Sequence, residues 1–352
     1  MTAAQPTVSV VVITYSRPDY VETCLDHLRA LATPVEQVIL VDSSPDRESA
    51  DLVESRYPEV EYVRSGLARG TMPEARSMGL ELATGDIVAF IDDDAFVFPR
   101  WRDELVRPYA DARVAAVGGR AINGAPGEAV FGLGDIGRLL PNGSLIGNFA
   151  ADPGRVIAVD HLIGANMSFR RDALAEIGGI HGYYPGTCVR EESDISLRLG
   201  AAGYRLVFAP QAVVHHVGAP YRIGGQRFDR RYLFYSQHNH VMLLARVYGF
   251  GSPYLRRYLW TALRGQVVFA RQFVRILSGR PDERGLRPTA RQRAIALAGV
   301  VSRVAAEWAG LAAGWAGAVR GRALDRRHGS AVMMPTGTVG EQHLALELGP
   351  SA

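Results

Sequence analysis

Over its first hundred residues the chain alternates short apolar runs with segments of helical periodicity. Residues 8–13 (VSVVVI) form a nearly continuous β-branched run, which is typical of a strand buried on both faces of a parallel sheet. A helical segment over 20–31 separates this run from a second strand over 38–41, and the alternation continues to 87–91 (IVAFI). This pattern predicts a doubly wound α/β sheet.

Charge divides the chain in two, although its net charge is only +3. Residues 1–220 are net negative by about ten and residues 221–328 are net positive by about fifteen. Every basic residue is an arginine, which excludes a Walker-type phosphate loop because that loop needs a lysine. We expect no nucleic-acid partner, since the first part is acidic and the second suits anionic lipid headgroups better than RNA.

Beyond residue 221 the composition becomes helical, arginine-studded and rich in large apolar residues. Residues 294–319 are long and apolar enough for a membrane span, but Arg303 and Glu307 lie in their middle. An interfacial or packed amphipathic helix is therefore favoured over a spanning one. Peripheral membrane contact through 221–330 and a plain helical cap or oligomer interface both remain open.

Cysteine content and the N-terminal segment bear on the compartment. Cys24 and Cys188 are too few for a disulfide framework or a cysteine-based zinc site. The segment MTAAQPT has neither the basic nor the apolar part of a signal peptide. We expect a cytoplasmic protein that is at most peripheral on the cytoplasmic membrane face.

Three adjacent carboxylates, Asp92, Asp93 and Asp94, directly follow the run over 87–91. Carboxylates at the end of a buried strand repel one another unless a cation lies between them. Mg²⁺ and Mn²⁺ take oxygen ligands and are often shared between carboxylates and a substrate's phosphates. The triplet indicates a divalent metal site, and an acidic solvated turn is the alternative.

Other polar residues follow predicted strands at the same edge of the sheet. Asp42 ends the second strand, where it can accept hydrogen bonds from a nucleoside or form an Asx turn. After the first strand come Thr14, Tyr15 and Arg17, which offer an aromatic face for a base and a guanidinium for phosphate. Arg76, on the helix before the acidic strand, can serve likewise or lie on the surface.

An acidic cluster, Glu191, Glu192 and Asp194, opens a predicted helix over 193–202. Carboxylates in a first helical turn complement the helix dipole and cap free N–H groups, which is the structural interpretation. The alternative is a general base that takes a proton from an acceptor hydroxyl, if the fold brings the cluster opposite the metal.

Two histidines, His215 and His216, end a strand-like segment over 212–216. An imidazole at this position can join the carboxylates as a metal ligand. A histidine pair alone is more often structural, so the pair carries no assignment by itself.

Together these motifs, in this order, resemble the family 2 glycosyltransferases, which are inverting enzymes with a GT-A fold. The resemblance covers residues 8–218. VSVVVITYSR is similar to the family's opening strand and nucleotide loop, ATGDIVAFIDDDA to its DxD segment and EESDISLRLGAAGYRL to its base motif. The fold implied is a Rossmann-like mixed sheet with a helical, arginine-rich C-terminal extension.

The resemblance implies roles for the residues at the edge of the sheet. Asp42 would contact the base, and Asp92 and Asp94 would form the DxD pair, with Asp94 the preferred metal ligand. The late metal-ligating histidine of the family falls on His215, with His216 as the alternative. The expected donor contacts are Thr14, Tyr15, Arg17, Asp42, Arg76, Asp92 and Asp93.

The family's catalytic base falls on Glu192. An aspartate is more common at that position, so Asp194 and Glu191 remain alternatives. Glu192 would take a proton from the acceptor hydroxyl during a single displacement at the anomeric carbon.

The implied reaction moves a sugar from a nucleoside-diphosphate sugar to a hydroxyl of a glycan or lipid-linked acceptor, assisted by Mn²⁺ or Mg²⁺. UDP is the family's commonest nucleotide. We expect a GT-A catalytic domain over 1–220, with a nucleotide-binding half (1–100) and an acceptor-side half (101–220), then a helical region over 221–330 and a flexible tail. A sugar-phosphate nucleotidyltransferase and a non-catalytic nucleotide-binding scaffold are the alternatives, and the oligomeric state is undetermined.

Overall fold

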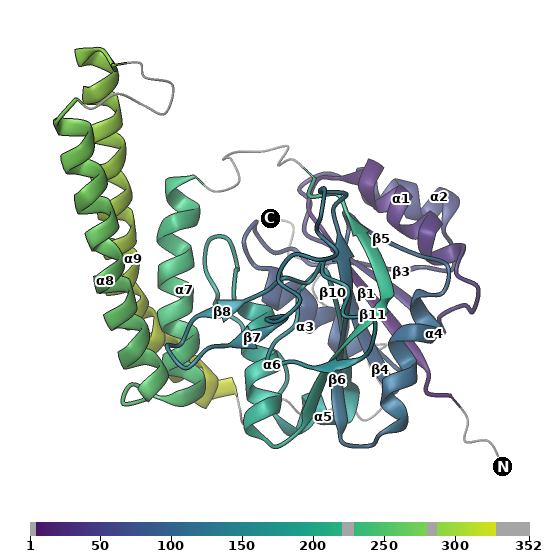
Figure 1. The fold of residues 1–352 in the computed structure, drawn as a ribbon. Coiled ribbons are helices and arrows are strands. Elements are labelled where there is room, and N and C mark those ends of the chain that lie inside the picture. Colours follow the sequence, from purple (N-terminus) through teal and green to yellow (C-terminus); the bar gives the residue numbers. More distant parts are fainter. Residues whose placement is uncertain (1–4, 220–228, 280–286, 329–352) are drawn as a thin grey trace, which may run out of the picture.

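The computed structural model describes residues 5–219, 229–279 and 287–328. Figure 1 shows a twisted sheet with helices on both faces and a group of long helices along one side. The expected tail over 331–352 and the boundary expected at residue 220 fall outside the described residues.

The large sheet is mixed, as the GT-A resemblance implies. Its strand order is β3-β2-β1-β4-β10-β6-β11-β5, with β9 paired to β11. Strands β1 to β4 run parallel, whereas β10 is antiparallel to both of its neighbours, β4 and β6. The strands are β1 (Val8–Thr14), β2 (Gln37–Asp42), β3 (Glu61–Arg64), β4 (Ile87–Asp92), β5 (Ala95–Val97), β6 (Val114–Ile122), β9 (Ile157–Ala158), β10 (Asn166–Arg170) and β11 (Arg205–His216).

Helices cover both faces of this sheet. Alternate side chains of β1 point into the cores on the two faces, which explains why its sequence is apolar throughout. Val10 and Val12 pack with α1 (Pro18–Arg29), α2 (Glu48–Arg56) and α4 (Trp101–Val106), the last followed by the 3-10 turn η1 (Arg107–Ala110). Val11 and Ile13 face the opposite core, with α3 (Met72–Leu82), α5 (Arg171–Glu176) and α6 (Glu191–Ala201). Successive strand residues point to opposite faces, so burial on both faces demands a continuous apolar run.

Three further helices form the C-terminal unit: α7 (Arg230–Tyr248), α8 (Pro253–Leu277) and α9 (Ala290–His328). Glycines let α9 lie close along α7. A Cβ at Gly314 would lie 2.6 Å from the carbonyl oxygen of His238, and one at Gly317 would lie 2.7 Å from His238 Nε2. By length and composition alone α9 could cross a membrane, but this is weak evidence. The segment 294–319 lies within α9.

Two imidazoles join the catalytic and C-terminal parts through a small hairpin of β7 (Arg138–Leu139) and β8 (Leu145–Ile146). His240 Nε2 on α7 lies 2.8 Å from the carbonyl oxygen of Gly143. From the other side, His161 Nε2 lies 3.0 Å from the carbonyl oxygen of Ile146. Burial, reinforced by the charge of Arg190, lowers the pKa of His161 to about 4 and that of His240 to about 3. Both rings are therefore neutral at physiological pH.

Some boundaries differ from the sequence prediction. The strand-like segment over 212–216 is the end of a longer strand, β11, which begins at Arg205 and has a register shift between Ala209 and Val213. The glycine-rich stretch 119–148, which shows no clear periodicity in the sequence, contains the end of β6 and the β7–β8 hairpin. Helix α6 begins at Glu191, two residues earlier than predicted, so all three acidic residues lie in its first turn.

Candidate active site

A cavity of about 230 Å³ opens at the carboxyl ends of β1 and β4. The chain passes from β1 to β2 on one side, whereas β4 lies on the other, so the strand order reverses at this point. Ligands of open α/β sheets bind at such a reversal. The cavity lining includes Thr14, Tyr15, Arg17, Asp92, Asp93, Asp94 and His216.

Asp93 is buried beside the cavity and accepts two hydrogen bonds. The Thr14 hydroxyl donates to its Oδ2 at 2.8 Å, and Arg17 Nη1 donates to its Oδ1 at 2.9 Å. Burial raises the pKa of Asp93 to about 7, against the charge of Arg17 and with a contribution from Asp94. Asp93 thus fastens the loop after β1 to the acidic turn after β4.

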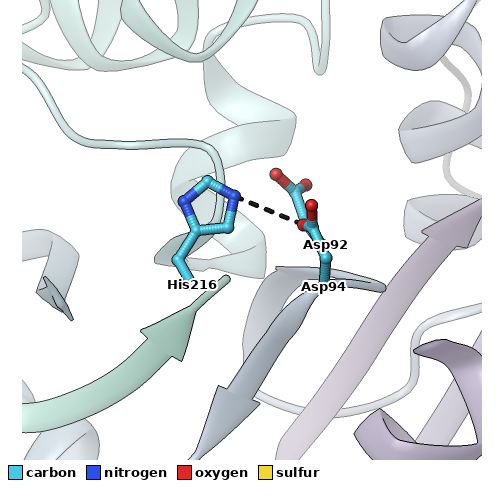
Figure 2. A group of neighbouring side chains, drawn as sticks. All are labelled: Asp92, Asp94 and His216. Carbon is cyan, nitrogen blue, oxygen red and sulfur yellow. Dashed lines mark ion pairs between the residues drawn. The ribbon is translucent and has the colours of Figure 1, made fainter. Parts of the chain in front are cut away.

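Asp92, Asp94 and His216 form a group that can hold a metal ion. One potential ligand atom from each lies within 4.8 Å of the others. Figure 2 shows the imidazole at the end of β11 beside both carboxylates, with His216 Nε2 3.3 Å from Asp94 Oδ1. Burial opposes ionisation of Asp94, but His216 and Arg17 lower its pKa below the ordinary value. Carboxylate oxygens with an imidazole nitrogen can bind a divalent cation such as Mn²⁺.

The histidine in this group is His216, whereas the family resemblance favours His215. On β11 the two residues pair with neighbouring positions of β5, His215 with Phe96 and His216 with Ala95. Adjacent residues of a strand point to opposite faces, so only one of the two rings can turn toward the carboxylates. The geometry therefore favours His216, the alternative, over His215.

Arg76 connects the acidic turn to the start of α6. Its side chain is 1% exposed, Nη2 donates to Asp92 Oδ1 at 2.8 Å, and Nη1 forms an ion pair with Glu191. Removing one member would leave an unpaired buried charge, which is strongly unfavourable. Neither Arg76 nor Glu191 is among the residues that line the cavity. The two side chains thus connect the acidic turn to the start of α6, and donor contact for Arg76 and base chemistry for Glu191 stay predictions.

Asp194 is occupied by an internal network. Its carboxylate accepts hydrogen bonds from Tyr184 Oη at 2.7 Å and Arg198 Nε at 2.6 Å, and His181 Nδ1 lies 3.0 Å away. Burial opposes ionisation, yet Arg198 and His181 lower the pKa of Asp194 well below its usual range. A fully buried carboxylate with these partners is an anchor for α6 and is poorly suited to accept a proton.

The C-terminal unit reaches the loop that leads to this network. Arg246 of α7 donates from Nη1 to the carbonyl oxygen of Gly182 at 3.1 Å. It also donates from Nε to Asp325 of α9 at 3.0 Å, and its guanidinium lies 5.0 Å from the ring centre of Tyr184. Helices α7 and α9 therefore help to hold the loop before α6.

Glu192 differs from both acidic neighbours because it has no ion-pair partner among the described residues. It is half-buried and accepts a hydrogen bond from Ser193 Oγ at 3.2 Å. Burial raises its pKa, against the charge of Arg190. The preceding backbone is strained, with φ of +56° at Cys188 and +85° at Arg190. Cys188 lines the cavity wall, whereas Glu192 does not.

Asp42 lies at the end of β2, as predicted, but its carboxylate faces the protein. It is fully buried and accepts hydrogen bonds from the Ser44 backbone N–H at 2.7 Å and from Tyr62 Oη at 2.9 Å. The Ser44 contact is the Asx-type turn that the sequence left open. Ser43, rather than Asp42, lines the cavity at this point.

Comparison with known proteins identifies the family. Residues 9–178 match the profile described as Glycosyl transferase family 2. The chain is 32% identical over 239 residues to the glucosyl-dolichyl phosphate glucuronosyltransferase of Haloferax volcanii. The aligned residues make up 61% of this chain and 70% of that relative. The chain belongs to glycosyl transferase family 2. It is also 28% identical over 218 residues to the succinoglycan biosynthesis protein ExoM of Rhizobium meliloti, with 59% of this chain and 66% of that protein aligned.

Solved structures confirm the GT-A fold of this family 2 glycosyltransferase. The mannosyltransferase PcManGT from Pyrobaculum calidifontis, in complex with GDP-Man and Mn²⁺, has a TM-score of 0.56 at 19% identity and covers 92% of this chain and 89% of its own. GalNAc-T7 with UDP, GalNAc and Mn²⁺ has a TM-score of 0.51 at 17% identity, and the match covers 72% of this chain and 54% of GalNAc-T7.

The cavity of this glycosyltransferase also contains residues that sequence reasoning missed. Arg69 precedes α3, and Asp229, Arg231 and Tyr232 belong to the first turn of α7 or its N-cap. No local motif marks the three C-terminal residues, because only the packing of α7 brings them to the edge of the sheet. The helical extension thus forms part of the cavity wall.

Proposed function

We propose that this glycosyltransferase transfers a hexosyl group from a UDP-sugar to a hydroxyl of a glycan or lipid-linked acceptor, with inversion at the anomeric carbon. The observation that carries the proposal is the convergence of Asp92, Asp94 and His216 in one cavity, linked through Arg76 to the helix that bears Glu192. Metal and base chemistry then belong to one assembly, as a single displacement requires.

Asp92, Asp94 and His216 would hold the divalent cation. When bound, the cation supplies positive charge to the diphosphate that departs with the nucleoside. Asp93 supports this group indirectly, since it holds Arg17 and Thr14 at the cavity edge. Arg17 and Tyr15 line the cavity and offer the donor a guanidinium and an aromatic face.

Glu192 is the proposed base. Its raised pKa keeps it a stronger proton acceptor than an ordinary glutamate, which suits a group that must remove a hydroxyl proton near neutral pH. As Glu192 takes the proton, the acceptor oxygen bonds to the anomeric carbon and the bond from that carbon to the diphosphate oxygen breaks. The nucleoside diphosphate leaves with the bonding electrons, and attack from the opposite side inverts the configuration.

The donor and acceptor classes rest on the family and on the names of relatives. One relative is named for a glucosyl-dolichyl phosphate substrate, which supports a lipid-linked acceptor here. The two solved neighbours contain GDP-Man in one case and UDP in the other, so GDP-sugars are the first competitors to test.

A panel of UDP-, GDP- and dTDP-sugars, incubated with the protein and Mn²⁺, tests this function. We expect metal-dependent release of the nucleoside diphosphate from one UDP-sugar, and a product whose anomeric configuration, measured by NMR, is opposite to that of the donor. A nucleotidyltransferase would instead release pyrophosphate from a nucleoside triphosphate and a sugar phosphate. A scaffold would give neither product, and retention of configuration would contradict the proposed mechanism.

A further inference from the structure

The outer face of α8 combines exposed apolar side chains with arginines. Trp260, Val267 and Val274 recur every seven residues and are 54%, 49% and 63% exposed. Residues seven apart lie almost above one another on a helix, so these side chains form one stripe. Leu263 and Leu277, at 45% and 60% exposure, each follow a member of the stripe by three residues and therefore widen it.

Arginines line one edge of this stripe. Arg264, Arg271 and Arg275 are all exposed, and helical geometry places them on one flank of the apolar residues. Helix α8 holds five arginines and no acidic residue. The stripe together with Arg264, Arg271 and Arg275 is called the α8 face below.

The other helix of the hairpin is engaged differently. Helix α9 lies against α7 through Gly310, Gly314 and Gly317, whose positions leave no room for a Cβ. Its two acidic residues are also engaged within the protein, Glu307 by Gln266 and Arg303, and Asp325 by Arg246. Helix α9 also exposes apolar side chains, among them Ile295, Val301 and Val319, at 62%, 55% and 54%. On α8, in contrast, the exposed apolar side chains and the arginines gather on one side of the helix, so the amphipathic surface is that of α8.

The direction of the hairpin places this face near the cavity. The first turn of α7 contributes to the cavity. Helix α8 runs back toward that end of α7, and it is longer than α7, with 25 residues compared with 19. Figure 1 shows the α8–α9 hairpin projecting past the start of α7, at the end of the molecule where β11 finishes. A surface that receives the C-terminal half of α8 would therefore face the cavity side of the enzyme.

We propose that the α8 face docks on a bilayer that contains anionic lipid. An amphipathic helix with tryptophan and valine on one face and arginines beside them gains both apolar burial and attraction to lipid phosphates. The arginines disfavour a second copy as the occupant, because symmetric pairing of two α8 faces would bring like charges together. The inference is independent of the donor and the base chemistry, since vesicle binding is measured without substrate.

Vesicle co-sedimentation of the full chain tests the proposal. We expect binding to mixed phosphatidylcholine and phosphatidylglycerol vesicles, weak binding to phosphatidylcholine alone, and loss of binding as salt is raised. The triple variant R264Q/R271Q/R275Q should need at least about tenfold more lipid for half-maximal binding. W260S/V267S/V274S should weaken binding by a similar factor, because it removes apolar burial.

Matched controls remove equal charge or apolar area elsewhere. Arg47, Arg100 and Arg107 are 58%, 72% and 63% exposed on the catalytic part, and their change to Gln should leave vesicle binding within about twofold. Val130→Ser with Phe131→Ser serves the same purpose for apolar exposure. Circular dichroism establishes that each variant is folded, and the salt dependence of the wild-type protein needs no variant at all.

Three results would overturn the proposal. One is absence of binding to anionic vesicles by the wild-type chain. Another is equal binding by the α8-face variants and their controls. The third is a dimer in light scattering that R264Q/R271Q/R275Q strengthens and W260S/V267S/V274S abolishes, since the α8 face would then be covered by a second copy.

Discussion

The edge of the sheet and the α8–α9 hairpin differ in whether their charged side chains are buried or exposed. At the edge, Asp93 and Asp94 are nearly inaccessible, and arginine, histidine, hydroxyl and backbone donors surround them. On α8 the arginines are exposed beside apolar side chains. A buried charge needs partners inside the protein and is held in one geometry, whereas an exposed charge beside an apolar stripe is suited to a partner outside it.

The two regions should therefore tolerate substitutions differently. Substitutions at the edge of the sheet should act through chemistry and metal binding, with large effects at single positions. Substitutions in the helical unit should act through packing or surface attraction, with smaller effects that add up over several residues.

The largest effect is expected at Glu192. Glu192→Gln should lower the rate of transfer by roughly 10³-fold because the amide cannot accept the acceptor's proton, while nucleotide affinity stays the same. Steady-state transfer rates and nucleotide titration measure the two quantities. Glu48→Gln, in the first turn of α2, is the matched control for loss of a helix N-terminal carboxylate and should leave transfer unchanged. Wild-type transfer in Glu192→Gln would remove this residue from the role of base.

The next largest effect is expected on Mn²⁺ affinity, and it should differ between the neighbouring residues His215 and His216. His216→Ala should weaken Mn²⁺ binding at least about tenfold, because it removes one member of the proposed metal-binding group. His215→Ala should change Mn²⁺ affinity by less than about twofold. Isothermal titration with Mn²⁺ measures both variants, and the opposite ranking would return the ligand role to His215.

Packing of the helical unit is tested at two glycines with different surroundings. Gly314→Ala should destabilise the protein by about 1–3 kcal/mol, because its Cβ would press on the backbone of α7. Gly265 has open space around it on α8, so Gly265→Ala should be neutral or stabilising by up to about 1 kcal/mol. Urea denaturation measures both, and equal effects would show that α9 does not depend on close approach to α7.

The smallest effect concerns pH at the junction of the two regions. His161 and His240 are buried with pKa values lowered to about 4 and about 3, so the unfolded chain takes up their protons first as pH falls through the usual histidine pKa. Stability is therefore retained above that pKa and lost below it, by about 1 kcal/mol per histidine between pH 7.5 and 5.5. Urea denaturation at both pH values should show a smaller loss in His240→Asn, and an unchanged loss would contradict the assignment.

Much of the catalytic part could be predicted from local patterns. The β-branched run over 8–13 and the IVAFI run before Asp92 predicted strands that the structure confirms, since burial on both faces of a sheet leaves little choice of residue. The meeting of Thr14, Arg17 and the aspartates followed from parallel strands ending at one edge. These inferences needed only periodicity and strand direction.

Residue roles that depend on side-chain direction could not be predicted in the same way. Asp42 and Arg76 lie at the expected edge, but their side chains turn into the protein, toward Tyr62 and Glu191. The carboxylates of Glu191, Glu192 and Asp194 look equivalent in the sequence, yet only Glu192 is left without an ion-pair partner among the described residues. These differences in side-chain direction and pairing depend on contacts between residues that lie far apart in the chain.

The sequence by itself determined the sheet, the acidic edge and the family, because each rests on spacing along the chain and on the demand that buried strands be apolar. Only the tertiary structure decided that His216 is the histidine beside Asp92 and Asp94, that the first turn of α7 completes the cavity, and that α8 carries the exposed amphipathic face. Those outcomes depend on which way a side chain points once distant segments pack, and that direction is set by neighbours far away in the chain.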